Sequence, residues 1–395
     1  MKKIIISFGL VLLYQATFAQ FETTIPFSET EDSSIFNIQL VNNDENNFTI
    51  SLNGKQFNEG VDNRFIEGSS STFSGFCELQ KEDHTIHSKK IVNYPFTPIH
   101  IEQSADFVFA IGEVGNTKTQ SIGNVQMKTQ CKNLVIAKSD FERVNYISYL
   151  EPTCDFNHLY SSSFYEGNYY VLYLANEQRY LIKLSDSLTL VSKNEINETI
   201  IEAKPSPLGD KFIITIADND NWESQKKSNL HFDGRVDDLS NFFSYPVENR
   251  ISAPKSILDI EYGWIYGYTA SENAEENMIY KYALEGELID KYTIGHKYLG
   301  WIVIDGQLIV ISQTYHDGDD SKPLNITVFN ENFFPVKNLD FGKPLLTVTD
   351  VYLNNEFNEY LISGFLDTHF GDEKVERKVS KMYFLQGSIT QLLAY

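Results

Sequence analysis

The feature that most constrains the fold of this 395-residue chain is an apolar, strand-like run that recurs along most of its length. Each copy is rich in Ile, Val, Leu and aromatic residues and is bounded by Asn, Asp, Gly or Ser, which is the composition of a β-strand between turns. A spacing of about 40 to 60 residues indicates a repeated supersecondary unit. The copies are FVFAIGEV (107–114), YYVLYLAN (169–176), FIITIADN (212–219), WIYGYTAS (264–271), LIVISQTY (308–315) and YLISGFLD (360–367).

A second motif follows most of these runs and consists of an apolar strand, a short polar turn and a return strand. Its turns read SD, EG, NEN and QG, which are residues that favour hairpins. A further strand precedes each run, as in SILDIEYG (256–263) and TVTDVYLN (347–354), so each unit supplies four antiparallel strands. The segment FCELQKEDHTIHSKKI (76–91) has the same hairpin pattern and places one more unit upstream.

These units predict an all-β fold, a β-propeller of seven four-stranded blades, with six or eight as alternatives because residues 21–75 are irregular. Long helical periodicity is nearly absent, and an aromatic content of 14% suits pleated surfaces. A two-sheet sandwich is the competing architecture, but it rarely uses so many strands. We expect the last unit to end the chain on its return strand, within MYFLQGSITQLLAY (382–395).

One segment carries a family resemblance. KPSPLGDKFIITIA (204–217) resembles the S-P-x-G-x-x signature, followed by apolar residues, of TolB-like and WD40-like blades. Leu208 stands where that signature usually has Asp. The resemblance covers one blade and implies a propeller whose function depends on its loops.

The N-terminus has the features of an export signal. Lys2 and Lys3 precede an apolar run of about ten residues (4–13), and Thr17 and Ala19 occupy the −3 and −1 positions of a cleavage site. The run is too short to cross a bilayer, which takes roughly 20 apolar residues.

We therefore predict a signal peptide over residues 1–19, a single propeller domain over 20–395, and a periplasmic or extracellular location. The FAQ ending of the signal resembles signals common in the Bacteroidota. The absence of a second long apolar segment in the sequence argues against membrane insertion.

The charge of the chain restricts its partners. There are 54 Asp and Glu residues against 32 Lys and Arg, a net charge of −22, and loss of Lys2 and Lys3 with the signal makes it two units more negative. Such a field repels phosphate backbones, so we exclude nucleic acid as a partner. Cations, proteins and neutral glycans remain possible ligands.

The three cysteines, Cys77, Cys131 and Cys154, allow at most one internal disulfide. Cys131 with Cys154 is the favoured pair on sequence separation, and buried thiols are the alternative.

The loops from the second to the third strand of each blade emerge on one face of a propeller, and four of them are acidic. They are expected at residues 218–227, 271–278, 315–323 and 367–378. Two contain H-x-G-D, at 316–319 and 369–372, so a shared ligand-binding face is predicted there. Its candidate residues are Asp218, Asp220, Trp222, Tyr315, His316, Asp317, Asp319, Asp320, Asp367, His369 and Asp372.

The residue types of this face suit more than one role. Asp317, Asp319 and Asp320 offer oxygen ligands for Ca²⁺, although the spacing does not fit an EF-hand because Lys322 replaces the glycine needed for the turn. The structural alternative is a set of well-solvated acidic turns. Trp222 suits either a sugar-stacking platform or packing over a neighbouring blade.

The sequence lacks the G-x-S-x-G, H-E-x-x-H and P-loop signatures. We therefore favour a non-enzymatic module that binds a protein or a glycan and requires no cofactor. A propeller-type hydrolase or lyase and a calcium-stabilised scaffold remain the alternatives.

Overall fold

The structure, a computed structural model, describes most of the chain between residues 20 and 393. Its description leaves out residues 1–19, 24–32, 44–45, 58–69, 83–85, 93, 95, 105–106, 123–124, 141–143, 151–155, 207, 220, 247–251, 253, 272, 274–275, 314–322, 342–345, 355–357, 371–376 and 394–395. The described residues form seven antiparallel sheets in two compact units.

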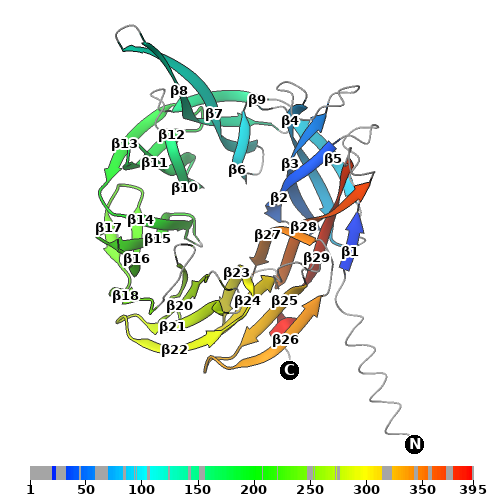
Figure 1. Cartoon of the computed structure of the whole chain (residues 1–395), viewed down its shortest axis with the longest axis vertical. Coiled ribbons are helices and arrows are strands. Elements are labelled where there is room, and N and C mark those ends of the chain that lie inside the picture. The colour runs from blue at the N-terminus through cyan, green and yellow to red at the C-terminus, as the bar shows by residue number, and fades with distance from the viewer. Residues whose placement is uncertain are drawn as a thin grey trace, which may run out of the picture. The chain divides into compact units, whose positions relative to one another are not determined.

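One unit comprises residues 90–297 and contains four consecutive sheets, β6–β9, β10–β13, β14–β17 and β19–β22, drawn from cyan to yellow in Figure 1. In each sheet the strand order follows the chain, which is the meander of a propeller blade. The strands are β6 (Thr97–Ser104), β7 (Phe107–Ile122), β8 (Val125–Ser139), β9 (Val144–Leu150), β10 (Phe156–Tyr165), β11 (Asn168–Ala175), β12 (Gln178–Ser185), β13 (Leu190–Ile196), β14 (Ile200–Pro205), β15 (Lys211–Asp218), β16 (Asn221–His231), β17 (Val236–Asp238), β18 (Phe243–Ser244, beside β16), β19 (Lys255–Asp259), β20 (Trp264–Thr269), β21 (Met278–Ala283) and β22 (Leu288–Thr293).

The recurrent apolar runs of the sequence are the second strands of these sheets, and both faces of each are covered. In β11, Tyr169, Val171 and Tyr173 pack in a cluster with β7 and β8, whereas Tyr170 and Leu172 pack in a cluster with β15. Successive side chains of a strand point to opposite faces, so one strand serves two neighbouring cores. This explains why the runs are continuously apolar instead of alternating.

The other unit comprises residues up to 89 together with 298–395 and contains the sheets β2–β5, β23–β26 and β27–β29 with β1. Its elements are β1 (Gln20–Thr23), β2 (Ser33–Asn43), β3 (Asn47–Phe57), β4 (Ser70–Gln80), β5 (Ile86–Val92), β23 (Lys297–Ile304), β24 (Gln307–Gln313), β25 (Leu324–Phe329), β26 (Pro335–Phe341), β27 (Leu346–Asn354), β28 (Glu359–Phe370), β29 (Arg377–Ser388) and the helix α2 (Ile389–Leu393).

The prediction that the chain ends on a return strand is wrong. After β29 it forms α2, whose Ile389 and Leu392 are buried in the core of this unit. The side chain of Asn358 accepts the backbone N–H of Thr390 at 2.8 Å and so caps the helix from a distant turn. The fourth strand of this sheet is β1, which pairs with β29 from Gln20 opposite Leu385 to Thr23 opposite Met382.

The prediction of an all-β propeller is confirmed by these four-stranded meanders. The signature-like segment forms the hairpin between β14 and β15, where Gly209 has φ of +68° and donates its N–H to the carbonyl of Ser206 at 2.9 Å. Leu208 is exposed in this turn. In the described part of the chain, no helix is long and apolar enough to cross a membrane.

Candidate functional site

Two of the predicted acidic loops are shorter in the structure than the sequence suggested. The segment 218–227 was expected to be a loop, but β16 begins at Asn221 and continues the pairing. The buried Gln225 lies in this segment, and its side-chain amide donates to the carbonyls of Trp222 and Pro254. Likewise β28 extends to Phe370 and β29 begins at Arg377, so both ends of the segment 367–378 are strand, and its middle, 371–376, lies outside the described residues.

The structure places only some of the predicted face residues. Asp218 lies at the end of β15, where its carboxylate accepts the side-chain amide of Asn219, and Trp222 is half exposed in β16. Asp367 and His369 lie in β28, opposite Ser380 and Lys378. The others lie outside the described residues: Asp220, Tyr315, His316, Asp317, Asp319, Asp320 and Asp372.

The pairing of His316 with His369 therefore stays a prediction, as does the Ca²⁺ site of Asp317, Asp319 and Asp320. Among the residues that the structure describes, no group of three or more His, Cys, Asp or Glu side chains is placed to hold a metal ion. Cys131 lies in β8 opposite Asn116, and Cys154 falls outside the description, so their disulfide is untested. Cys77 is buried in β4.

A pair of strand aspartates that look equivalent in the sequence occupy different places. Asp259 ends β19 and accepts the backbone N–H of Tyr262 in the following turn at 3.1 Å. Asp350 lies in the middle of β27 and accepts the backbone N–H of Leu40 in β2 at 2.8 Å. Both carboxylates satisfy backbone amides, and burial raises the pKa of Asp350.

A concave site lies on the first strands of three consecutive sheets in the 90–297 unit. It is a pocket of about 540 Å³ formed by one end of β6 and β10, part of β14, and Glu113 of β7. We call it the first-strand pocket. Its lining residues are Ile99, His100, Glu113, Phe156, Asn157, His158, Leu159, Tyr160, Ser161, Ala203, Lys204 and Pro205.

Two histidines of this pocket are held in the neutral state. Burial lowers the pKa of His100 to about 4 and also lowers the pKa of His158. The ring of His158 meets the edge of Tyr160 with 4.9 Å between the ring centroids. At pH 7 each imidazole is therefore an uncharged group with one donor and one acceptor nitrogen.

The charged residues of the pocket are compensated locally. Glu113 forms an ion pair with Lys132 at 2.8 Å, and Lys204 lies 3.5 Å from Glu202. Glu113 is also the last residue of β7 that pairs with β6. Beyond Glu113, β7 and β8 continue as a two-stranded hairpin that extends past β6 and β9 (Figure 1). In a chain with a net charge of −22, this pocket is thus close to neutral.

The buried carboxylate of Glu102 in β6 is hydrogen-bonded to β10. Glu102 accepts the backbone N–H of Phe164 at 3.0 Å and the hydroxyl of Ser162 at 3.2 Å. Tyr169 in turn donates to the Ser162 hydroxyl at 3.2 Å. Burial raises the pKa of Glu102, against the opposing effect of these hydrogen bonds.

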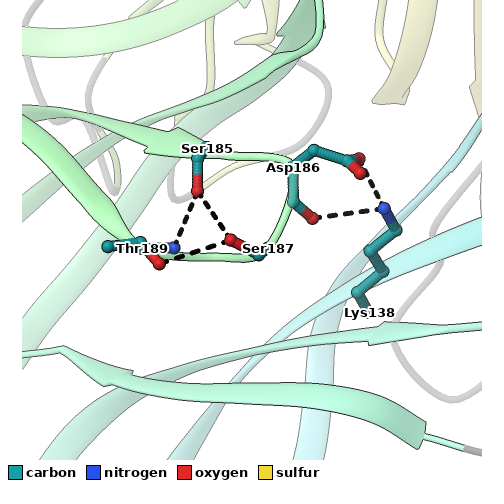
Figure 2. Close-up of polar contacts among 5 residues, drawn as sticks. All are labelled: Lys138, Ser185, Asp186, Ser187 and Thr189. Atoms are coloured by element: carbon teal, nitrogen blue, oxygen red, sulfur yellow. Dashed lines mark hydrogen bonds and ion pairs between the residues drawn. The ribbon is translucent and has the colours of Figure 1, made fainter.

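A second contact joins the same two sheets, between β8 of one sheet and the β12–β13 turn of the other. Lys138 of β8 donates to the carboxylate and, at 3.2 Å, to the main-chain carbonyl of Asp186 in the β12–β13 turn (Figure 2). Ser185 closes this turn, because its hydroxyl accepts the N–H of Thr189 at 3.1 Å. The sheets that carry β6 and β10 are therefore linked at two places, between these first strands and between β8 and the β12–β13 turn.

The pocket combines neutral hydrogen-bonding groups with apolar surface. Asn157 and Ser161 add an amide and a hydroxyl to the two imidazoles, while Phe156 and Leu159 supply apolar area. This arrangement can hydrogen-bond an uncharged polar molecule in both the donor and the acceptor sense. The sequence reasoning missed the pocket because it considered only loops, although His100 and His158 both stand in expected first-strand positions.

Comparison with known proteins gives fold-level similarity only. No family model matches the chain, and no curated protein matches it. Solved structures similar to it include BamB from Moraxella catarrhalis (9% identity, 92% of this chain and 97% of that chain, TM-score 0.43), BBS1N in complex with ARL6DN (11%, 93% and 96%, 0.47) and virginiamycin B lyase from Staphylococcus aureus (11%, 93% and 99%, 0.47). These values say nothing about the ligand or reaction of this chain.

Proposed function

We propose that this protein is an exported, non-enzymatic binding module that holds an uncharged polar ligand, a segment of a neutral glycan, in the first-strand pocket. The observation that carries the proposal is the near-neutral lining of the pocket within a strongly acidic chain. An anionic ligand is disfavoured by the field of the molecule, and a cationic ligand finds the carboxylate of Glu113 already paired with Lys132.

Glycan hydroxyls require partners that both donate and accept hydrogen bonds, and neutral histidine, asparagine and serine side chains do both. Aromatic and aliphatic side chains beside them cover the apolar faces of sugar rings. Tyr160, which is partly exposed and lines the pocket, is available for this role. A volume of about 540 Å³ falls within the usual range of small-molecule sites, about 300–1,000 Å³.

The test is a screen of the mature protein against an array of neutral and acidic glycans, followed by titration calorimetry on the best ligand. We expect His158→Ala and Tyr160→Ala each to weaken binding about tenfold or more, since each removes a lining side chain. Tyr146→Ala is the matched control, because Tyr146 is an exposed tyrosine of β9 that does not line the pocket. Equal affinity of the pocket variants and the control would refute the assignment.

The alternative is a hydrolase or lyase that uses the same pocket, since a neutral imidazole can accept a proton. Mass spectrometry of the bound glycan after prolonged incubation separates the two. An unchanged mass supports a binding module, whereas product formation that is lost in His158→Ala establishes the enzyme.

Export is part of the proposal and has its own test. The full chain, expressed in a bacterium, is recovered from the periplasm or the medium and sequenced from its N-terminus. A first residue of Gln20 supports cleavage after Ala19. Retention of Met1 in a cytoplasmic product would overturn it.

A further inference from the structure

Lys227 of β16 is a buried lysine whose hydrogen-bond acceptors are both uncharged. Its Nζ donates to the hydroxyl of Thr215 and to the main-chain carbonyl of Ser256, each at 2.7 Å. The residue is only 4% exposed. Lys138, by comparison, is nearly as buried but meets the carboxylate of Asp186.

This geometry suits the neutral amine better than the ammonium ion. An amine has two N–H donors and a lone pair, and Thr215 and Ser256 accept exactly two hydrogen bonds; an ammonium ion has a third N–H to satisfy in a buried place. Burial lowers the pKa of Lys227 to about 8, with Glu202 opposing that effect and Lys204 adding to it. The amine of Lys227 is therefore uncharged in about a tenth of the molecules at pH 7 and in about half at pH 8.

A small cavity gives access to this amine. It has a volume of about 170 Å³ and lies between β14, β15 and β16 on one side and β19 of the next sheet on the other. Lys204 and Pro205 line both this cavity and the first-strand pocket, so the two adjoin along β14. The lining residues are Glu202, Lys204, Pro205, Ile213, Thr215, Lys227, Ser256, Ile257 and Leu258.

We propose that Lys227 is a reactive amine that condenses with a small aldehyde or ketone entering this cavity. In that step the Nζ lone pair attacks the carbonyl carbon, and one of the two Nζ protons passes to the carbonyl oxygen to give a carbinolamine. Loss of the Nζ proton and of the hydroxyl group as water then forms the C=N bond, with no oxidant or reductant required. Apolar side chains such as Ile213 and Leu258 favour a carbonyl compound with a short aliphatic body.

Two features together set Lys227 apart from the other lysines nearby. Lys204 lines the same cavity, but its side chain is largely exposed and lies beside Glu202. Lys281 is as buried as Lys227, but it lies over the ring of Trp264, 4.2 Å from the centroid, and does not line the cavity. Access and a neutral hydrogen-bond environment therefore coincide at Lys227.

The experiment treats the folded mature protein at pH 7 with propionaldehyde and cyanoborohydride, which reduces an imine to a stable alkylamine. Peptide mass spectrometry then measures the initial labelling rate of each lysine. We expect Lys227 to be labelled at least about tenfold faster than Lys204 and Lys281, because burial lowers its pKa to about 8 and so raises its fraction of neutral amine above that of an ordinary lysine. Part of that advantage is lost to limited access.

Two controls keep the result decisive. In urea the advantage of Lys227 should disappear, since it depends on the folded cavity. Thr215→Val leaves the lysine in place but removes one acceptor, and we expect it to change the labelling rate of Lys227 and not that of Lys204. The proposal would be overturned if Lys227 were labelled no faster than Lys281 in the folded protein. It would also be overturned if Lys227 kept the same advantage over the other lysines in urea.

Discussion

The contact between Lys138 and Asp186 predicts an asymmetry that can be measured. The side chain of Lys138 is 10% exposed, whereas that of Asp186 is 64% exposed. Removal of the carboxylate leaves a buried ammonium ion, but removal of the lysine leaves a carboxylate that water already reaches. We therefore expect Asp186→Asn to destabilise the protein more than Lys138→Met does.

The magnitudes follow from the remaining contacts. In Asp186→Asn, Lys138 keeps the main-chain carbonyl at 3.2 Å and the ring of Phe107, 3.9 Å from its centroid. The loss is thus that of one charge-assisted hydrogen bond, about 1.5–3 kcal/mol, reduced because the aspartate is partly hydrated. In Lys138→Met the cost of burying the charge of the ammonium group also disappears. We therefore expect the free energy of unfolding to fall by no more than about 1 kcal/mol.

The assay is urea denaturation of the mature protein and of the two single variants. Far-UV circular dichroism and tyrosine fluorescence monitor the unfolding. Arg235→Met is the control, because the ion pair of Arg235 with Asp237 is exposed on both sides and its loss should cost less than about 1 kcal/mol. A larger loss in Lys138→Met than in Asp186→Asn would refute the reasoning.

Three further predictions concern pH, packing and sheet completion. The pKa of His100 is about 4 in the folded state and about 6.5 in the unfolded state. The contribution of neutral His100 to folding stability is therefore complete above pH 6.5 and is lost as the pH falls toward 4. His100→Gln should flatten the dependence of thermal stability on pH between these values, by up to about 3 kcal/mol. Gly267→Ala would place a Cβ 2.4 Å from the ring of Tyr245, and we expect it to cost about 1–3 kcal/mol in urea unfolding. Deletion of residues 20–23 leaves the outer edge of β29 unpaired, so light scattering should detect aggregation at a lower temperature; an unchanged onset would contradict the pairing.

The strands of the fold could be predicted from the sequence because the second strand of each sheet is covered on both faces. A continuous apolar run such as YYVLYLAN is the direct result of that burial, and it recurs wherever a sheet recurs. The C-terminal helix could not be predicted in this way. The side chain that caps this helix is that of Asn358, which lies in a distant turn. The sheet before the helix is completed by β1, from the opposite end of the chain.

The site residues were harder to predict because neither cavity lies on a single local segment. The first-strand pocket draws residues from three sheets, and no spacing in the sequence indicates that His100 and Tyr160 line the same pocket. Lys226 and Lys227 are neighbours in a segment that reads as an exposed loop. Only the strand register, with Lys227 opposite Thr215, distinguishes the buried lysine from the one that pairs with Asp238.

We propose that the near-neutral first-strand pocket binds an uncharged glycan. The most direct test is calorimetric titration of the best array ligand at low and at high salt. We predict an affinity that changes less than about twofold with salt, because no net charge is neutralised on binding, and that falls in Tyr160→Ala. An affinity that collapses in high salt, or that persists in Tyr160→Ala, would rule out a neutral glycan site in the first-strand pocket.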